Sequence, residues 1–338
     1  MRQTISGPPV SVLDVHAHHL GTDVVGGSQG DGPHIILDET GRGRLIDGQM
    51  APREVPISMW SVPERLREMD AAGISHQVIS PVPAAMEHAW RNVAYARSVN
   101  DSIASACREA GGRLIGLGCL PAAQTRDEAA RCVGLGLKGV EMGTRMAAFE
   151  LDAPDLAPVW ETCEHLGLVV FVHPTMGGRG AVRRDEGWLA AGLGMVTDTA
   201  LAAYALAFGG VLASHPQLRV LLAHGGGTFG WVYPRMRAIA AVGGVDVAGW
   251  ETLIRRMYVD TLVFDAEQIR LLACRFGPDR LVLGSDCPYL PLETAMLLSR
   301  AEDASAAGGV LAGSTHDLLA GNGQRLFGLV PKDHDAIA

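Results

Sequence analysis

Short apolar runs alternate with longer amphipathic segments along the whole 338-residue chain, and this alternation restricts the fold more than any other feature. The runs are rich in Val, Ile and Leu without polar alternation, which is typical of strands buried on both faces. There are eight of them, at residues 12–18, 76–83, 114–121, 137–143, 168–174, 219–226, 257–264 and 281–289. Eight strands in alternation with helices predict an α/β chain folded as a (β/α)8 TIM-like barrel.

A doubly wound open sheet is the alternative arrangement of the same elements. Its dinucleotide-binding form would place a G-x-G-x-x-G sequence directly after the first strand, and the sequence has none there. The hydrophobic share of 48% and the charged share of 19% are those of a globular, core-rich chain. We therefore expect one domain over residues 1–338.

The segment at about residues 20–60 interrupts the alternation, because it is rich in Gly and Asp. Within it, HIILDETGRGRLIDG (34–48) favours a hairpin that turns at ETGRG. A loop of this length without regular structure is usually functional or disordered. We expect a small insertion after the first strand, lying over the barrel mouth as a lid.

Charge and hydropathy exclude several classes of partner. The net charge is −9 and the sequence has no basic stripe, so nucleic acid is not an expected partner. The longest apolar stretches, near 166–174 and 218–227, are shorter than the roughly 20 residues of a membrane span, and the N-terminus lacks a signal-peptide core. Six scattered cysteines without a C-x-x-C pair indicate reduced thiols. We predict a cytoplasmic protein without a membrane partner.

Histidines gather where the predicted strands end. His16 and His18 end the first strand, His173 the fifth, His224 the sixth, and Asp286 the eighth. In a (β/α)8 barrel these ends converge on one face, and strand residues two apart point the same way. Each histidine alone could be structural, but imidazoles and a carboxylate at matching strand ends suit Zn²⁺ or a related divalent metal.

Three neighbouring residues are not predicted to be ligands. His19 points to the opposite face from His18, so we expect it to pack or to lie in a loop. Lys138 lies near the start of the fourth strand, away from the mouth, and is rejected as a metal-bridging lysine. Cys287 follows Asp286 directly, and a packing role is expected for its thiol.

The motifs of the chain together resemble the amidohydrolase superfamily, and within it the aminocarboxymuconate-semialdehyde decarboxylase family. The resemblance is carried, in the family's order, by DVHAHHL (14–20), FVHP (171–174), LLAHGGGTFGW (221–231), VFDAEQIRLLACRFGPDRLVLGSDCPY (263–289) and GNGQRLFGL (321–329). It spans almost the whole chain. It implies a distorted (β/α)8 barrel that holds one divalent metal ion, usually zinc.

The resemblance also implies a division of labour among the strand-end residues. His16, His18, His173 and Asp286 are then the metal ligands, and Asp286 counts with His224 among the catalytic residues. His224 is the acid/base, which agrees with the need for a proton-exchanging group that is not tied to the metal. We expect Zn²⁺, with Mn²⁺ or Co²⁺ as alternatives, and no organic cofactor.

Two arginines match substrate-binding positions of the family. Arg53 lies seven residues before Trp60, and Arg235 lies eleven residues after His224. In the family the second arginine reaches the neighbouring subunit's site, so the resemblance implies a homodimer in which Arg235 acts across the interface. An arginine fork binds carboxylates bidentately, which indicates an acidic small-molecule substrate. The alternative for each is an ordinary surface arginine.

The chain departs from the family's pattern where the substrate would lie. His173 is followed by PTMGGRG, and Tyr289 stands where Phe is usual. Trp188 and Arg179 could shape this altered pocket or simply pack and face solvent. The metal chemistry is therefore better supported than the identity of the substrate.

These observations favour an enzyme, a metal-dependent non-oxidative decarboxylase (a carboxy-lyase). The expected substrate is an aromatic or ring-opened carboxylic acid of aromatic catabolism, such as aminocarboxymuconate semialdehyde or a hydroxybenzoate. His224 would deprotonate water or supply the proton that replaces CO₂. A hydrolase or hydratase that uses the same site is the alternative, because function does not follow from fold. A non-catalytic metal-binding protein is disfavoured by the presence of His224.

Overall fold

A barrel of eight parallel strands organises the structure, a computed structural model that describes residues 11–24, 32–48, 51–175, 186–290, 293–306 and 309–329. Its strands, in spatial order, are β1 (Leu13–His19), β5 (His76–Pro81), β6 (Leu114–Gly118), β7 (Gly139–Gly143), β10 (Val169–His173), β11 (Arg219–Leu222), β12 (Tyr258–Asp260) and β13 (Leu281–Val282). The chain just after β13 closes the ring on β1, since the Val15 amide donates to the Leu283 carbonyl at 2.8 Å and the His18 amide to the Cys287 carbonyl at 2.7 Å. The predicted barrel is confirmed, and the open sheet is excluded.

Each of the eight predicted apolar runs corresponds to one of these strands, but β1 extends one residue past its run and several other strands end earlier than theirs. The run at 219–226 yields only β11, after which the chain turns sharply at His224. Register is in step across the middle of the sheet, where Val172 of β10 lies beside Met142 on one side and Leu222 on the other. Strand ends from distant parts of the sequence are therefore level with one another at the mouth.

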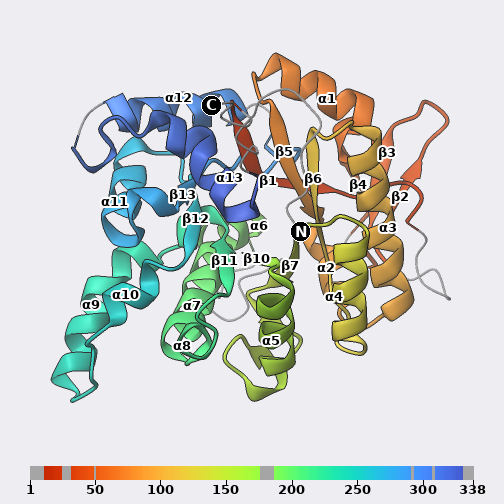
Figure 1. Ribbon diagram of the computed structural model, residues 1–338. Helices are drawn as coiled ribbons and strands as arrows, with labels where there is room; N and C mark the ends of the chain where they lie inside the picture. The colour runs from red at the N-terminus through yellow and green to blue at the C-terminus, as the bar shows by residue number, and fades with distance from the viewer. Residues whose placement is uncertain are drawn as a thin grey trace, which may run out of the picture.

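Helices cover the outside of the barrel (Figure 1). They are α1 (Val62–Ala71), α2 (Pro83–Ala89), α3 (Val93–Glu109), α4 (Thr125–Gly134), α5 (Ala157–Leu166), α6 (Gly187–Leu189), α7 (Met195–Phe208), α8 (Val211–Ser214), α9 (Phe229–Val242), α10 (Trp250–Ile254), α11 (Ala266–Phe276), α12 (Glu293–Ala306) and α13 (Asn322–Phe327). Side-chain caps fix several starts: Asn92 accepts from the Tyr95 amide at 3.0 Å and Asp265 from the Gln268 amide at 2.9 Å.

The barrel interior is a packed apolar core beneath the mouth. Its fully buried side chains include Leu13, Val15, Val78, Val169, Phe171, Leu221, Ala223 and Val282. The Phe171 ring is the upper layer of this core, 5.0 Å from the ring of His16. The strand-end histidines therefore rest on a dry, rigid floor, which fixes their rotamers.

The insertion after β1 is a small antiparallel sheet of β2 (His34–Leu37), β3 (Gly43–Ile46) and β4 (Arg53–Val55). The predicted hairpin is confirmed as β2 and β3, whereas β4 was not predicted. The sheet lies beside α3 (Figure 1), where its buried side chains join the core of α2 and α3 and the Tyr95 hydroxyl donates to the Pro33 carbonyl at 2.5 Å. This position brings Arg53 of β4 to the edge of the mouth. Residues 25–31 and 49–50 of the predicted lid lie outside the described residues.

One helical stretch is longer and more apolar than the sequence analysis expected. Residues Gly187–Phe208 could cross a membrane by length and composition alone. The stretch includes α7, whose Ala202, Ala203 and Leu206 side chains are fully buried against the rest of the protein. A single such helix that packs into a folded core is weak support for a membrane span.

Candidate metal centre and active site

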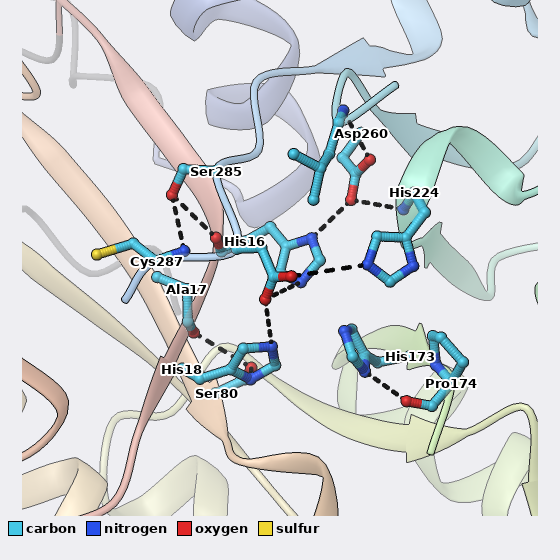
Figure 2. A network of polar contacts seen from close by, with 12 residues as sticks. His16, Ala17, His18, Ser80, His173, Pro174, His224, Asp260, Ser285 and Cys287 are labelled. Carbon is cyan, nitrogen blue, oxygen red and sulfur yellow. Dashed lines mark hydrogen bonds and ion pairs between the residues drawn. The ribbon is translucent and has the colours of Figure 1, made fainter. Parts of the chain in front are cut away.

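Four of the predicted residues meet at the barrel mouth. Figure 2 shows three of them, His16, His18 and His173, with their rings close together. His16, His18, His173 and Asp286 each offer one ligand atom, and these four atoms all lie within 4.8 Å of one another. The Asp286 Oδ1 atom is 3.6 Å from His16 Nε2 and 3.2 Å from His18 Nε2. Ligand atoms bound tetrahedrally at zinc distances lie about 3.3 Å apart. The spacing of the cluster therefore matches that of a metal coordination shell.

The same four ligand atoms lack other partners. The Nε2 atoms of His16, His18 and His173 and the Oδ1 atom of Asp286 are buried without a hydrogen-bond partner in the described part of the chain. Buried polar atoms are normally satisfied, so a convergent group of orphaned lone pairs is unusual. One divalent cation would satisfy all of them, and the residues present therefore fit a metal ion.

Each histidine is oriented by a hydrogen bond from its far ring nitrogen. His18 Nδ1 lies 2.8 Å from the Pro81 carbonyl oxygen, and His173 Nδ1 lies 2.8 Å from that of Pro174. A carbonyl oxygen can only accept, so both Nδ1 atoms carry the proton and both Nε2 atoms keep a free lone pair. This arrangement is typical of metal-ligating histidines.

Electrostatics favour the protonation states that a metal requires at two of the ligands, Asp286 and His173. Burial alone would raise the pKa of Asp286, but its contacts with His18 and His224 and the charge of His16 hold that pKa well below its usual range. Burial, together with the other histidines, lowers the pKa of His173 well below its usual range. A carboxylate and a neutral imidazole are therefore the stable forms.

Asp260 connects the ligand set to the turn that carries His224. It ends β12, is fully buried, and accepts from His16 Nδ1 at 2.8 Å. It also accepts from the backbone amides of His224 at 3.0 Å and Gly225 at 2.9 Å. These bonds hold its pKa below the usual value even though burial alone would raise it. Sequence reasoning missed this residue, because Asp260 lies in the middle of the predicted run at 257–264 and ends a strand only in the structure.

Glu141 is a second residue that the sequence analysis missed. It lies on β7 and is buried, and its carboxylate oxygens are 4.0 Å from His18 Nδ1 and 3.9 Å from His173 Nδ1. Burial raises the pKa of Glu141 to about 7. The carboxyl group thus lies behind two of the candidate ligands rather than beside the metal position.

His224 lies next to the four-residue cluster but outside it. Its Nε2 atom is 4.0 Å from Asp286 Oδ2, and its ring centroid is 5.1 Å from that of His173. The backbone of His224 has φ = 54°, which is uncommon for a non-glycine residue and costs about 1–3 kcal/mol. The hydrogen bonds that the His224 and Gly225 amides donate to Asp260 hold this strained turn, which keeps the His224 side chain facing the cavity.

Arg53 and Tyr289 complete the inner wall of the site. The guanidinium carbon of Arg53 lies 6.0 Å from the centroid of the Tyr289 ring, and that ring is 5.5 Å from the ring of His18. Arg53 Nε and the Tyr289 hydroxyl are both buried without a hydrogen-bond partner among the described residues. Two unsatisfied donors near a metal position are suited to the oxygens of a carboxylate or a phenol.

Of the remaining predicted residues that the structure describes, Arg235 and Trp188 are not brought to the centre. Arg235 is exposed on α9 and does not appear among the described residues that line the cavity. Trp188 has 72% of its surface exposed, and Arg179 lies outside the described residues. His19 is buried beside Arg65, and burial lowers its pKa to about 3, as fits a packing residue.

Cys287 and Lys138 have the positions expected for them. Burial raises the pKa of the Cys287 thiol to about 11, which leaves it unreactive. Lys138 directly precedes β7, at the end of the strand opposite the mouth.

The centre opens into a cavity of about 1000 Å³. At its inner end lie His173, His224 and Asp286, with Arg53 and Tyr289 beside them. Most of the other described lining residues are apolar, and most belong to α7, α9 and α11 or to the segments that lead directly into these helices. An apolar cavity with a few convergent polar groups is the usual form of a small-molecule site.

Comparison with known proteins agrees with this geometry. The family model described as amidohydrolase matches residues 13–329. The 2-amino-3-carboxymuconate-6-semialdehyde decarboxylase of Dictyostelium discoideum is 32% identical over 308 residues, which cover 86% of this chain and 82% of that protein.

Solved structures share the fold. The IDCase of Metarhizium anisopliae, in its apo form, superimposes with a TM-score of 0.80 at 23% identity, covering 94% of this chain and 97% of that one. A dihydroxybenzoic acid decarboxylase from Polaromonas sp. JS666, with bound manganese and the inhibitor 2-nitroresorcinol, has a TM-score of 0.72 at 19% identity and covers 95% and 98%. The match over nearly the whole chain, together with a relative at 32% identity, shows that the protein belongs to the amidohydrolase family, alongside the aminocarboxymuconate-semialdehyde decarboxylases.

Proposed function

We propose that the protein is a metal-dependent, non-oxidative decarboxylase of an aromatic or ring-opened carboxylic acid. The observation that carries this proposal is the position of His224, beside a four-ligand cluster but outside it, in a cavity that also contains Arg53. A fixed proton donor next to a metal and a carboxylate-binding arginine are the groups that exchange of CO₂ for a proton requires. Decarboxylation is also the reaction named for the Dictyostelium relative.

The chain's own residues have distinct tasks in this reaction. Arg53 binds a carboxylate, and Tyr289 packs against the substrate beside it. When the bond to the carboxylate breaks, CO₂ leaves and its electron pair stays on the carbon. His224 delivers a proton to that carbon. The metal ion, when bound, supplies positive charge that stabilises the oxygens next to the reacting carbon.

The proposed ligands are His16, His18, His173 and Asp286, and the proposed metal is Zn²⁺, with Mn²⁺ or Co²⁺ as alternatives. Three imidazoles and one carboxylate suit all of these ions, so the identity of the bound metal depends on metal supply as well as on geometry. The manganese of the Polaromonas protein makes Mn²⁺ a necessary member of any reconstitution series.

We also propose that the active form is a homodimer in which Arg235 enters the partner's site. Arg235 is exposed on α9 four residues after Trp231, so the two share one face of the helix. The same helix exposes Ile239 and Val242, and Trp231 lines the cavity entrance.

All six cysteines are free thiols, which supports a reducing, cytoplasmic location.

The substitution His224→Ala tests the assignment of roles. We expect the variant to bind one metal ion with unchanged affinity and to lose about 10²–10⁴-fold in CO₂ release, because only proton transfer is removed. Metal content is measured by elemental analysis and CO₂ by headspace detection. Loss of the metal together with activity would show that His224 is a ligand. If the wild type hydrolyses esters or amides and releases no CO₂, the protein is a hydrolase.

A further inference from the structure

The cavity extends well past the candidate metal centre. Its outer lobe, defined here by Met195, Val196, Val263, Phe264 and Leu271, lies between the starts of α7 and α9 and the helix α11. The whole cavity measures about 1000 Å³, at the upper end of the range for sites that take drug-sized ligands. A single ring with a carboxylate and hydroxyls fills only the inner end.

The wall of the lobe is mainly apolar. All five defining side chains are apolar, and four of them are half-buried although they belong to a well-packed region, because they face the cavity. The polar residues of the lobe in the described chain are Thr228, Glu267 and Gln268, so that part of the wall includes no cation. Such a surface disfavours a second carboxylate and favours a hydrocarbon group.

Phe264 indicates that the lobe is a functional part of the site. Its backbone has φ = 58°, an outlier for a bulky aromatic residue, and its side chain is 45% exposed on the cavity wall. His224 and Asp286 share this conformation, so three of the five non-glycine residues with positive φ in the described chain line one cavity. Backbone strain of this kind is concentrated at ligand-binding positions.

We infer that the outer lobe binds an apolar substituent of the substrate, and that the substrate is an aromatic acid with an alkyl or prenyl side chain of several carbons. The inference rests on the proposed function, since the carboxylate must lie at the inner end near Arg53 for the substituent to enter the lobe. Phe264 and Leu271 are then the residues that determine chain-length specificity.

A series of unreactive ligands tests the inference without using catalysis. The probes are 2-nitroresorcinols with linear 5-alkyl groups from methyl to pentyl, titrated calorimetrically into the metal-loaded protein. Each methylene that enters an apolar lobe strengthens binding about fourfold, so we expect Kd to fall by about 30-fold or more across the series. CO₂ release from hydroxybenzoates with the same alkyl groups is measured in parallel.

Two tryptophan variants of α11 provide the matched comparison. Leu271→Trp fills the lobe and should flatten the dependence of Kd on chain length while leaving binding of 2-nitroresorcinol itself within about twofold. Cys274→Trp places the same side chain on the exposed face of the same helix and should retain the full dependence. If Leu271→Trp does not fold, the dependence of Kd on chain length in the wild type decides whether the inference holds.

The outcomes separate this inference from the proposed function. A Kd that tightens with chain length supports the lobe even when no member of the substrate series releases CO₂, in which case the proposed decarboxylation fails alone. A flat wild-type series, or no binding by any probe, overturns the inference. CO₂ release that is insensitive to chain length, with flat binding, overturns the inference and leaves the proposed function intact.

Discussion

At the scale of single residues, the candidate metal centre is organised by contacts made on the far side of each ligand. His16 is held by Asp260, and His18 and His173 are held by backbone carbonyl oxygens. The carbonyl partners belong to the backbone and cannot be removed by a substitution, whereas the contact with Asp260 depends on a side chain. Asp260 is therefore the most informative position to change without touching a ligand.

The substitution Asp260→Asn should weaken metal binding about 10–100-fold, because the amide cannot orient His16 as the carboxylate does. Affinity is measured by competition with a chromophoric chelator, which needs no substrate. Asp265→Asn is the matched control, since it makes the same change at a helix cap outside the site. Equal metal affinities of Asp260→Asn and the wild type would show that Asp260 does not support the metal centre.

The ligands could be predicted from sequence because they obey a simple rule of position. Histidines at the ends of apolar runs meet at the mouth of a barrel, whatever their separation in the chain. The same rule does not identify Asp260, because this residue lies in the middle of the predicted run at 257–264 and ends β12 only in the structure. Glu141 could not be identified in this way, because its role depends on its distance from His18 and His173, which no pattern encodes.

At the scale of elements, the insertion is joined to the barrel by one face of its sheet. Ile35, Leu45 and Val55 are buried in the core shared with α2 and α3, and Tyr95 adds a hydrogen bond to Pro33. Arg53 lies on this sheet, so substrate binding depends on how firmly the insertion is held.

The substitution Tyr95→Phe leaves the Pro33 carbonyl without its donor in a buried position, at a cost of about 1–3 kcal/mol. We expect faster hydrogen exchange at the amides of β2 and β3, with unchanged exchange in β10 and β11. Tyr204→Phe, on the exposed face of α7, is the control. Uniform acceleration across the barrel would mean that the insertion does not open as a separate unit.

Helix α9 shows why some elements were not predicted. Its sequence contains Pro234, which deprives the Gly230 carbonyl of its helical donor and argues against a helix. In the structure the Arg275 side chain donates to that carbonyl at 3.1 Å. A donor from α11 thus compensates for the proline, and local sequence patterns do not reveal tertiary contacts of this kind.

Strand β4 of the insertion was not predicted, because three residues are too few for a periodic signal.

At the scale of the whole molecule, the proposed role of Arg235 requires two chains. Arg235 is exposed and is not brought to its own chain's cavity, so its proposed role requires a partner. Complementation between two inactive variants tests this directly.

A one-to-one mixture of Arg235→Ala and His224→Ala chains, dissociated and reassociated, should recover about a quarter of wild-type activity. Half of the dimers are then hybrids, and each hybrid has one site with an intact His224 and an intact partner arginine. The unmixed variants are the controls. No recovery, with hybrids verified by mass spectrometry, would mean that Arg235 acts within its own chain or not at all.

Stoichiometric metal reconstitution tests the central claim most directly. The metal is removed with a chelator, Zn²⁺, Mn²⁺ or Co²⁺ is added back in fractions of an equivalent, and CO₂ release is followed with a panel of hydroxybenzoates and aminocarboxymuconate semialdehyde. We expect activity to rise linearly and to stop at one metal ion per chain, with one CO₂ formed per substrate consumed. A fully loaded protein that releases no CO₂ from any member, or a metal-free protein of undiminished activity, would contradict the proposed metal-dependent decarboxylation.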